Sequence, residues 1–374
     1  MTKKLMAMLI STVAAVSLSG CLSGGNKPAA GTAAAESSTV KTDSPDKTED
    51  KKPAEYTLTF SGTVSDEHLV TKVEYYFRDK VEELTDGRVV IKVYNNNQLG
   101  GPTDVLSQVA SGDIDMSECA SIQLAGYTNQ LKWFNLPFLW ESKDAAMAFL
   151  KSEEGIAIRD KAAEETNIVI LGYADNGFFN LYSNKPIESP SQLKGFKIRC
   201  QESDVLLQIW DDLGANPMPM SFAELYTALQ QGTVDGMFNG YVTPASGGYW
   251  EVQDYISRIA VIYDVFTIQI NKDLYESMPE DIRQALNDAM AEAQEYGLEL
   301  AEQDNLAAKQ KLLDNGMEII DVMGDEDLYS QWVTAAQPTY DWFRKTYPDI
   351  DLDTILDGVK KYNEMYPGSD KDVK

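Results

Sequence analysis

The pattern of polar and apolar positions after residue 55 changes period along the chain and predicts strands followed by helices. Residues 56–62 alternate between apolar and polar side chains, as in a strand with one buried face. Apolar residues then recur at helical spacing from Leu69 to Leu84, and Asp86-Gly87 predicts the end of that helix. Residues 89–94 are β-branched and aromatic and predict the next strand. This β-α-β order indicates an α/β sheet with crossover helices.

The start of this first helix carries the one histidine of the chain, His68. Ser65, Asp66 and Glu67 directly precede it and are expected to supply the helix cap and an acidic first turn. For His68 itself we expect a solvated or capping role rather than a catalytic one.

Two segments in different halves of the chain resemble one another. Residues 107–116 and 227–236 each predict a helix that stops at a glycine, followed by a strand in which an apolar residue precedes Asp. Such turns could recur by chance, or they mark two similar lobes that each send a strand toward a shared cleft. Because ligands of α/β folds bind beyond the carboxyl ends of strands, residues after Asp115 and Asp235 are candidates for ligand contact.

A long helix is predicted at residues 278–313, with Asn315-Gly316 as its stop. At 1.5 Å per residue it would be roughly 50 Å long, which exceeds one small domain. Its apolar positions keep no sustained heptad, so a spine that crosses both lobes is favoured over a coiled-coil partner helix.

The N-terminus has the pattern of a targeting segment. Lys3 and Lys4 precede an apolar run at residues 5–16, which is typical of a signal peptide. The run ends in Leu18-Ser19-Gly20-Cys21, which looks like the lipobox of bacterial lipoproteins. That resemblance implies a signal peptide at 1–20 and a lipidated Cys21; a simple secretory signal with an incidental cysteine is the alternative. With the composition that follows, residues 21–54 are expected to be the lipidated cysteine and a disordered tether.

Composition excludes several function classes. The chain has 374 residues, with 32 Lys and Arg against 59 Asp and Glu, and its net charge of −27 argues against a nucleic-acid partner. Three cysteines exclude a disulfide scaffold and a zinc finger. Cys119 and Cys200 could pair, or they are small buried residues in separate strands. The chain has no nucleotide-binding or serine-hydrolase motif, so we expect no enzyme activity, metal or cofactor.

The globular part carries several sequence blocks in a fixed order. They are Thr85-Asp86-Gly87-Arg88-Val89, Asn97-Gln98-Leu99-Gly100, Gly112-Asp113-Ile114-Asp115, Leu136-Pro137-Phe138-Leu139, Leu193-Lys194-Gly195-Phe196-Lys197-Ile198-Arg199 and the run from Met218 to Gly236. In order and spacing the chain resembles the extracytoplasmic solute-binding subunits of TRAP transporters, the dicarboxylate-binding-protein family.

The resemblance implies an α/β, two-lobed fold like that of periplasmic binding proteins, with a hinge, a central cleft and a long bracing helix. Residues 55–176 with about 265–304 are expected to form lobe I, and 177–264 with about 305–374 lobe II.

It also implies that the protein captures a small organic acid, of the carboxylate or C4-dicarboxylate type, by closure of the cleft. It would deliver this ligand to the integral membrane subunits of the transporter for uptake, outside the cytoplasm and anchored to the membrane by lipid alone. A ligand-sensing or surface lipoprotein of the same fold is the alternative.

The resemblance also assigns candidate ligand-binding residues. The carboxylate-holding arginine of the family falls on Arg199, and a second anchor falls on Asn239. Phe222 matches an aromatic residue that lines the family's pocket, and Phe179 stands where many members carry another arginine. Ser121 is the candidate from the other half of the chain. The plainer alternatives are a structural ion pair for Arg199, a turn role for Asn239 and a core role for Phe222.

These departures from the family pattern bear on the ligand. One cation with additional aromatic residues suggests a monocarboxylate with an apolar or aromatic body, and a sugar acid is less favoured. A dicarboxylate could still use Arg199 together with backbone donors.

Overall fold

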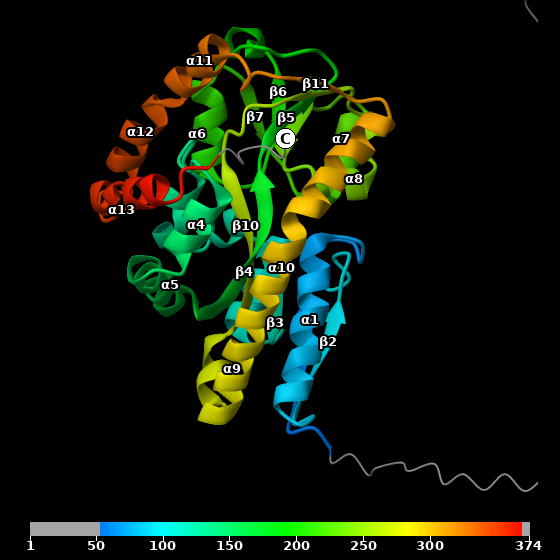
Figure 1. The fold of residues 1–374 in the computed structure, drawn as a ribbon, viewed down its shortest axis with the longest axis vertical. Helices are drawn as coiled ribbons and strands as arrows, with labels where there is room; N and C mark the ends of the chain where they lie inside the picture. Colours follow the sequence, from blue (N-terminus) through cyan, green and yellow to red (C-terminus); the bar gives the residue numbers. More distant parts are fainter. Residues whose placement is uncertain (1–52, 369–374) are drawn as a thin grey trace, which may run out of the picture. The chain divides into compact units, whose positions relative to one another are not determined.

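The computed structural model describes residues 53–368, which form two mixed β-sheets surrounded by helices (Figure 1). The first sheet has the order β2 (Val89–Tyr94), β1 (Tyr56–Ser61), β3 (Met116–Ala120), β10 (Tyr263–Asn271) and β4 (Ile168–Phe178). The second has the order β11 (Glu318–Ile320), β9 (Tyr255–Ser257), β5 (Asn180–Ser183), β8 (Gly236–Asn239), β6 (Lys197–Cys200) and β7 (Asn216–Pro219). The predicted signal peptide and Cys21 lie outside the described residues.

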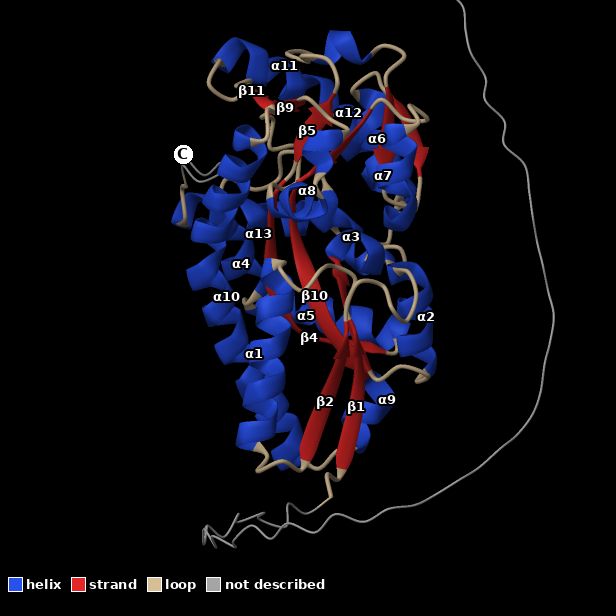
Figure 2. Ribbon diagram, turned by 90° about the vertical axis from the view of Figure 1, so that its right-hand side faces the viewer, coloured by secondary structure: helices blue, strands red, loops and turns tan. Residues whose placement is uncertain are grey.

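The helices of the described residues cover both sheets (Figure 2). They are α1 (Leu69–Leu84), α2 (Pro102–Ser111), α3 (Ser121–Leu124), α4 (Lys143–Leu150), α5 (Glu153–Thr166), α6 (Asp204–Asp212), α7 (Phe222–Gln230), α8 (Val242–Gly247), α9 (Lys272–Ser277), α10 (Glu280–Asp314), α11 (Glu326–Ala336), α12 (Pro338–Thr346) and α13 (Leu352–Met365). Short 3-10 helices are η1 (Asn129–Asn135), η2 (Pro190–Leu193) and η3 (Tyr249–Glu251).

The structure confirms the β-α-β unit that the sequence pattern predicts at the start of the described chain. Strands β1 and β2 pair in parallel, and helix α1 crosses between them. Apolar side chains of α1 at helical spacing, such as Val73 and Phe77, are fully buried in the core of the first sheet. The helix ends just before Asp86 and Gly87, which both have positive φ, as the sequence predicts.

The predicted cap of α1 is wrong in its position. The N-cap is His68, whose Nδ1 accepts the backbone N–H of Val70 at 3.2 Å. Ser65 instead accepts the backbone N–H of His68 in a turn that precedes the helix, so the acidic pair at 66 and 67 lies outside the first helical turn. The expected capping role of His68 is confirmed, but a solvated one is wrong because its side chain is 1% exposed.

The two similar segments lie one in each sheet. Each helix stops at a glycine of positive φ, and strands β3 and β8 then pair in parallel with β1 and β6. In both copies the aspartate before the strand holds the neighbouring strand: Asp115 Oδ2 accepts the N–H of Thr59 at 2.7 Å, and Asp235 Oδ2 accepts that of Lys197 at 2.8 Å. The repeated sequence therefore has a structural cause, which is the same strand-to-strand bond in each sheet.

Two short connections and one helix join the two sheets. Strand β4 leads through Phe179 into β5, and β9 leads through residues 258–262 into β10. The connections pair with each other, since Phe179 donates its N–H to Ile262 O at 2.8 Å and accepts that of Val261 at 2.9 Å. The predicted long helix is confirmed as α10, which contacts α1 and β4 of the first sheet and α8 beyond β8 of the second.

The C-terminal helices contact both halves of the described chain. Thr339 at the start of α12 donates to Asp212 of α6 at 2.7 Å. Helix α13 instead packs on α4, where the rings of Phe149 and Tyr362 lie 5.6 Å apart. The boundaries of the two lobes stay a prediction.

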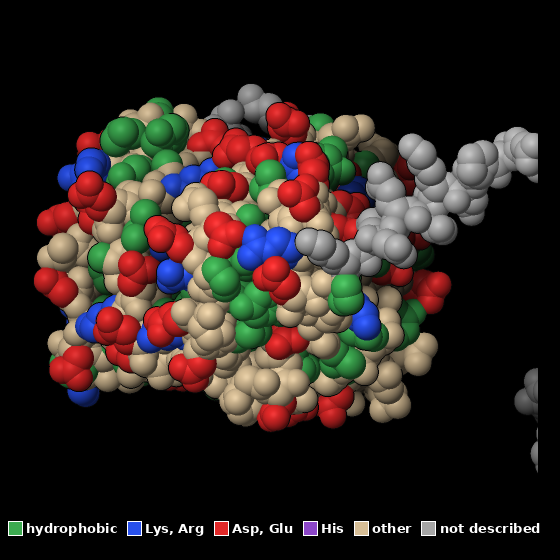
Figure 3. Space-filling model, turned by 90° about the horizontal axis from the view of Figure 1, so that it is seen from below, with side chains coloured by type: hydrophobic (Ala, Val, Ile, Leu, Met, Phe, Trp, Pro, Cys, Tyr) green, Lys and Arg blue, Asp and Glu red, His purple; other side chains and the backbone are tan. Residues whose placement is uncertain are grey.

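The two cysteines of the described residues form no disulfide bond. Cys119 and Cys200 are free and buried, which confirms their interpretation as small core residues. Acidic side chains are scattered among Lys and Arg on the face that Figure 3 shows. Within residues 53–368 no helix combines the length and the apolar character needed to cross a membrane.

We predict that Gly236→Ala destabilises the fold. A Cβ at this position of β8 would lie 2.3 Å from the carbonyl oxygen of Tyr182 and 2.6 Å from the ring of Phe196. Relief requires movement of a backbone strand, so a loss of roughly 1–3 kcal/mol in the free energy of unfolding is expected in urea titrations. Gly101→Ala is the matched control, because nothing lies within 4 Å of its added Cβ. Equal stability of the two variants would contradict the packing argument.

Candidate ligand-binding site

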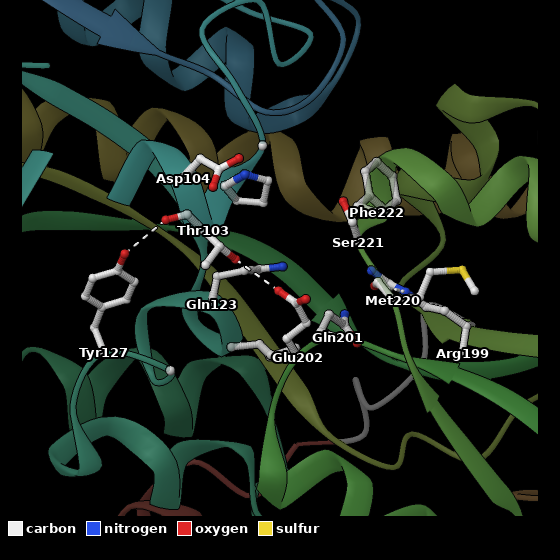
Figure 4. A pocket seen from close by; sticks show the side chains of 14 residues that line it. Thr103, Asp104, Gln123, Tyr127, Arg199, Gln201, Glu202, Met220, Ser221 and Phe222 are labelled. Atoms are coloured by element: carbon white, nitrogen blue, oxygen red, sulfur yellow. Dashed lines mark hydrogen bonds between the residues drawn. The ribbon is translucent and has the colours of Figure 1, made fainter. Parts of the chain in front are cut away.

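Two adjoining cavities lie between elements of the first and second sheets. The inner one, of about 40 Å³, is lined by Thr63, Val64, Pro102, Ala120, Gln123, Asn176, Phe179, Arg199, Gln201, Phe222, Asn239, Thr243 and Phe266. An outer one, of about 390 Å³, shares several of these side chains and continues past Tyr127 and Glu202 (Figure 4). The lining includes residues at or just beyond the ends of β3 and β8, where the sequence predicts ligand contact.

Arg199 is the one buried cation in the lining of the inner cavity. It is the third residue of β6, it is 1% exposed, and its Nε donates to the carbonyl oxygen of Met220 at 3.0 Å. Its guanidinium lies 5.9 Å from the ring centre of Phe222. Burial lowers the pKa of Arg199 to about 10, so the side chain stays charged at neutral pH.

No carboxylate of the described residues forms an ion pair with Arg199. A buried charge is stable only when it is paired and hydrogen-bonded, and here the protein supplies one carbonyl and an aromatic ring. The structural ion pair considered for this arginine is therefore not present in this part of the chain. A guanidinium binds most strongly to a compact anion with two acceptor oxygens.

Asn239 ends strand β8 and lines the same cavity. Its Oδ1 accepts the backbone N–H of Gly240 at 2.8 Å, which fixes the orientation of the amide. The Nδ2 group is thereby left as a donor without charge. Asn239 and Arg199, which are 40 positions apart in sequence, are brought together because β6 and β8 are neighbours in the second sheet.

The two candidate phenylalanines have different environments. Phe222 is half-buried at the start of α7 and lines both cavities. Phe179 is 1% exposed and meets Phe238 edge-on at 5.9 Å between ring centres, although it also lines the inner cavity. Phe179 is thus a core residue and a cavity wall at once.

Ser121 is buried but does not line either cavity. Its hydroxyl donates to Asp264 and accepts from the amide of Asn135 at 3.3 Å. Asp264 in turn accepts the amide N–H of Asn176, which does line the inner cavity, at 2.7 Å. The structure therefore places Ser121 one step behind the cavity wall.

Several polar wall residues carry no sequence motif that singles them out. Gln201 follows Arg199 by two positions and so points to the same side of the extended chain. The amide oxygens of Gln201 and Gln123 are buried and accept no hydrogen bond from the described residues. The alternation of side chains along an extended chain could have indicated from Arg199 that Gln201 faces the cavity. No local pattern in the sequence indicates the same for Gln123.

Thr63 is another cavity residue that only the structure reveals. Its N–H and its hydroxyl both donate to the carboxyl of Glu118, each at 2.8 Å. The hydroxyl proton is thereby occupied, so Thr63 Oγ1 can only accept a further hydrogen bond. Burial raises the pKa of Glu118 to about 7.

Two polar contacts lie in the wall of the outer cavity. Thr103 of α2 donates to Glu202 at 3.4 Å, and Tyr127 donates to the carbonyl of Thr103 at 3.0 Å (Figure 4). No group of His, Cys, Asp and Glu side chains within residues 53–368 has the arrangement of a metal site. The inner cavity therefore combines one cation with neutral amides, hydroxyls and aromatic rings, whereas Asp104 and Glu202 add two carboxylates to the outer one.

Comparison with known proteins finds one family. The model of the bacterial extracellular solute-binding proteins, family 7, matches residues 60–346. A solute-binding protein of Chromohalobacter salexigens is 32% identical over 276 residues, which is 74% of this chain and 81% of that protein. A C4-dicarboxylate-binding periplasmic protein of Vibrio cholerae is 29% identical over 309 residues, 81% of this chain and 90% of that one.

The fold comparison gives the same result. A crystal structure of a TRAP periplasmic solute-binding protein from Anaerococcus prevotii, with D-glucuronate bound, superposes with a TM-score of 0.79 at 26% identity. The match covers 84% of this chain and all of that one.

The buried Asp264 gives a testable pH dependence. Burial raises its pKa to about 7, while an unfolded aspartate titrates near 3.9. The folded protein therefore holds an extra proton between these values, and the contribution of Asp264 to stability falls as the pH rises through them. Asp264→Asn cannot titrate. We expect this variant to be less stable at all pH values, with its deficit relative to the wild type shrinking from pH 4 to pH 7.

Urea unfolding at a series of pH values measures that difference. Asp144→Asn, at an exposed position of α4, controls for the loss of one negative charge. A deficit of Asp264→Asn that stays constant across the range would contradict a raised pKa of Asp264.

Proposed function

The chain belongs to family 7 of the bacterial extracellular solute-binding proteins. Within that family we propose that its ligand is a hydroxylated monocarboxylate of the sugar-acid type. The protein is the solute-binding subunit of a TRAP transporter. It captures a small organic acid outside the cytoplasm for delivery to the membrane subunits, and it is not an enzyme. The observation that carries the proposal is the buried guanidinium of Arg199, which pairs with no acid of the described residues and lies among neutral polar side chains in the inner cavity.

Arg199 is the proposed anchor of the ligand carboxylate. Its planar guanidinium can donate two parallel hydrogen bonds to the two carboxylate oxygens, and it keeps its charge despite burial. The Nδ2 group of Asn239 can add a further donor. Phe222 would cover the apolar edge of this ion pair and exclude water from it.

The remaining wall favours a hydroxylated body over an apolar one. Seven of the thirteen residues that line the inner cavity are polar, and Arg199 is the single cation among them. Thr63 Oγ1 and the amide oxygens of Gln123 and Gln201 are acceptors that suit ligand hydroxyls. The apolar or aromatic ligand body that the sequence suggests therefore has little support. A second ligand carboxylate would find no second cation in this lining.

A similar protein supports the same class of ligand. The relative from Anaerococcus prevotii holds D-glucuronate, which combines one carboxylate with several hydroxyls. The Vibrio cholerae relative is named for C4-dicarboxylates, so ligand class varies among proteins of this similarity. The residues of this cavity favour the first type.

Closure around the ligand is the proposed mode of capture. The proposed lobes are residues 55–176 with about 265–304, and 177–264 with about 305–374. The two paired connections at Phe179 and residues 258–262 are the proposed hinge. A ligand that touches both walls binds the closed form more tightly, and this difference in affinity is what shifts the open and closed populations.

Membrane attachment through Cys21 is a further part of the proposal. The lipobox at residues 18–21 would make this cysteine the lipidated first residue of the mature chain. Residues 22–54 would then tether the binding unit within reach of the membrane subunits.

We predict that Arg199→Ala removes binding of D-glucuronate and leaves the fold intact. Loss of the buried cation leaves a ligand carboxylate unpaired, which should cost on the order of 2–5 kcal/mol, or roughly 30-fold to several-thousand-fold in Kd. Arg199→Lys should also bind weakly, since an ammonium cannot form the paired bonds of a guanidinium. Isothermal titration calorimetry measures both.

The fold of these variants is checked by thermal unfolding. Because Arg199 has no acid partner in the described chain, its removal should leave Tm unchanged or higher. Arg159→Ala is the matched control, as this arginine of α5 pairs with Asp160 and lines neither cavity. Unchanged affinity of folded Arg199→Ala would reject the proposed anchor.

We predict that Cys21→Ala abolishes membrane attachment in the native host. Without the thiol no lipid can be added, so the protein should leave the membrane fraction or keep its signal peptide. Cell fractionation with mass spectrometry of the mature N-terminus distinguishes these states. Cys119→Ala, a buried position, is the control and should fractionate as the wild type. Identical partitioning of both variants would favour an incidental cysteine at position 21.

A further inference from the structure

A buried hydrogen bond of His68 links the N-terminus of α1 to α8, which follows the second-sheet strand β8. Its Nε2 lies 3.2 Å from Oγ1 of Thr243, which belongs to α8 beyond strand β8. The two residues are 175 positions apart, and both are buried. The imidazole also meets Phe266 edge-on at 5.3 Å between ring centres. Thr243 and Phe266 both line the inner cavity, so His68 lies directly behind its wall.

The cap of α1 determines which nitrogen of His68 carries the proton. Nδ1 accepts the backbone N–H of Val70, so this nitrogen is unprotonated. A neutral imidazole then has its proton on Nε2, and Nε2 donates to Thr243. The hydroxyl oxygen of Thr243 accepts this hydrogen bond through one of its lone pairs. Its own proton therefore stays available for a different acceptor.

The surroundings of His68 keep the ring neutral. Burial, together with the positive charge of Lys72 on the same helix, lowers its pKa to about 3. Lys72 itself pairs with Asp304 of α10 at 2.6 Å. The groups that touch the ring from β10 and α8 are Phe266 and Thr243, and neither titrates in the neutral range.

We propose that His68 is a positioning residue that ties the two walls of the ligand cavity together and makes Thr243 a hydrogen-bond donor toward the ligand. Thr63, whose proton is given to Glu118, is the acceptor on the opposite wall. The hydroxyl of Thr243 then acts as a donor and that of Thr63 as an acceptor. This pair selects a ligand with an acceptor oxygen facing Thr243 and a hydroxyl facing Thr63. This inference rests on the proposed binding of a hydroxylated carboxylate.

A double-mutant cycle tests the pair with D-glucuronate as the probe. His68→Asn keeps a good helix cap, but its side chain is too short to reach Thr243. Thr243→Val keeps the shape and removes the hydroxyl. Each variant should lose about tenfold in affinity, and the double variant no more than either one, because both remove the same bond. Additive losses would overturn the proposal.

The matched control for the cap is Ser152→Asn. Ser152 caps α5 through its hydroxyl and lines neither cavity. This exchange should leave the affinity for D-glucuronate unchanged. If it weakens binding as much as His68→Asn does, a general effect on helix stability replaces the proposed role.

Nitrogen NMR of the imidazole tests the bond without relying on affinity. His68 is the one histidine of the chain, so its two ring nitrogens are resolved in untagged protein. With or without D-glucuronate, we expect a state with the proton on Nε2, no titration between pH 5 and 8, and a shifted Nε2 resonance in Thr243→Val. An imidazole that titrates near 6.5 in both states, or is insensitive to Thr243→Val, would overturn the proposal.

The two readouts separate this inference from the proposed ligand class. If the wild type does not bind D-glucuronate, the ligand class is wrong, and the imidazole resonances alone decide whether His68 holds Thr243. If D-glucuronate binds but the resonances do not respond to Thr243→Val, the ligand class stands and the role of His68 is rejected.

Discussion

A guanidinium that is almost completely removed from water, and that pairs with no acid of the described residues, is the constraint on which the proposed site depends. Burying Arg199 costs free energy that one carbonyl and one aromatic ring only partly offset. An internal carboxylate would stabilise the fold but would occupy the position that a ligand must take. In the inner cavity the chain instead surrounds the charge with neutral amides and hydroxyls, and the proposed ligand carboxylate would complete the site.

Buried acids are present near the cavity, but each one acts on a wall residue rather than on the cation. Glu118 receives both donors of Thr63, and Asp264 receives the amide of Asn176. Burial raises the pKa of both carboxyls to about 7. Together with His68 behind Thr243, these carboxyls form a layer of hydrogen-bond partners behind the cavity wall. They orient the polar side chains that line the inner cavity.

The arrangement of the sheets explains how one site can draw on both halves of the chain. Strands β4 and β10 lead from the first sheet to the second through two short, paired connections, and α10 contacts elements of both. The cavity lies where the carboxyl ends of strands β3 and β8 approach one another. A fold with so few connections between its sheets can bring two walls onto a small ligand without rebuilding either sheet.

The sequence by itself determined the local elements, because periodicity and turn residues act over neighbouring positions. Its resemblances to known families supplied the lipobox-like N-terminus and the candidates Arg199, Asn239 and Phe222. Only the tertiary structure decided that Ser121 binds Asp264 behind the wall, that Thr63 and Gln123 face the cavity, and that His68 is buried. The hydrogen bonds that Thr63, Ser121 and His68 make across the fold span 55, 143 and 175 positions of the sequence. Hydrogen bonding and desolvation at such positions depend on which distant segments pack together, and no local pattern records that.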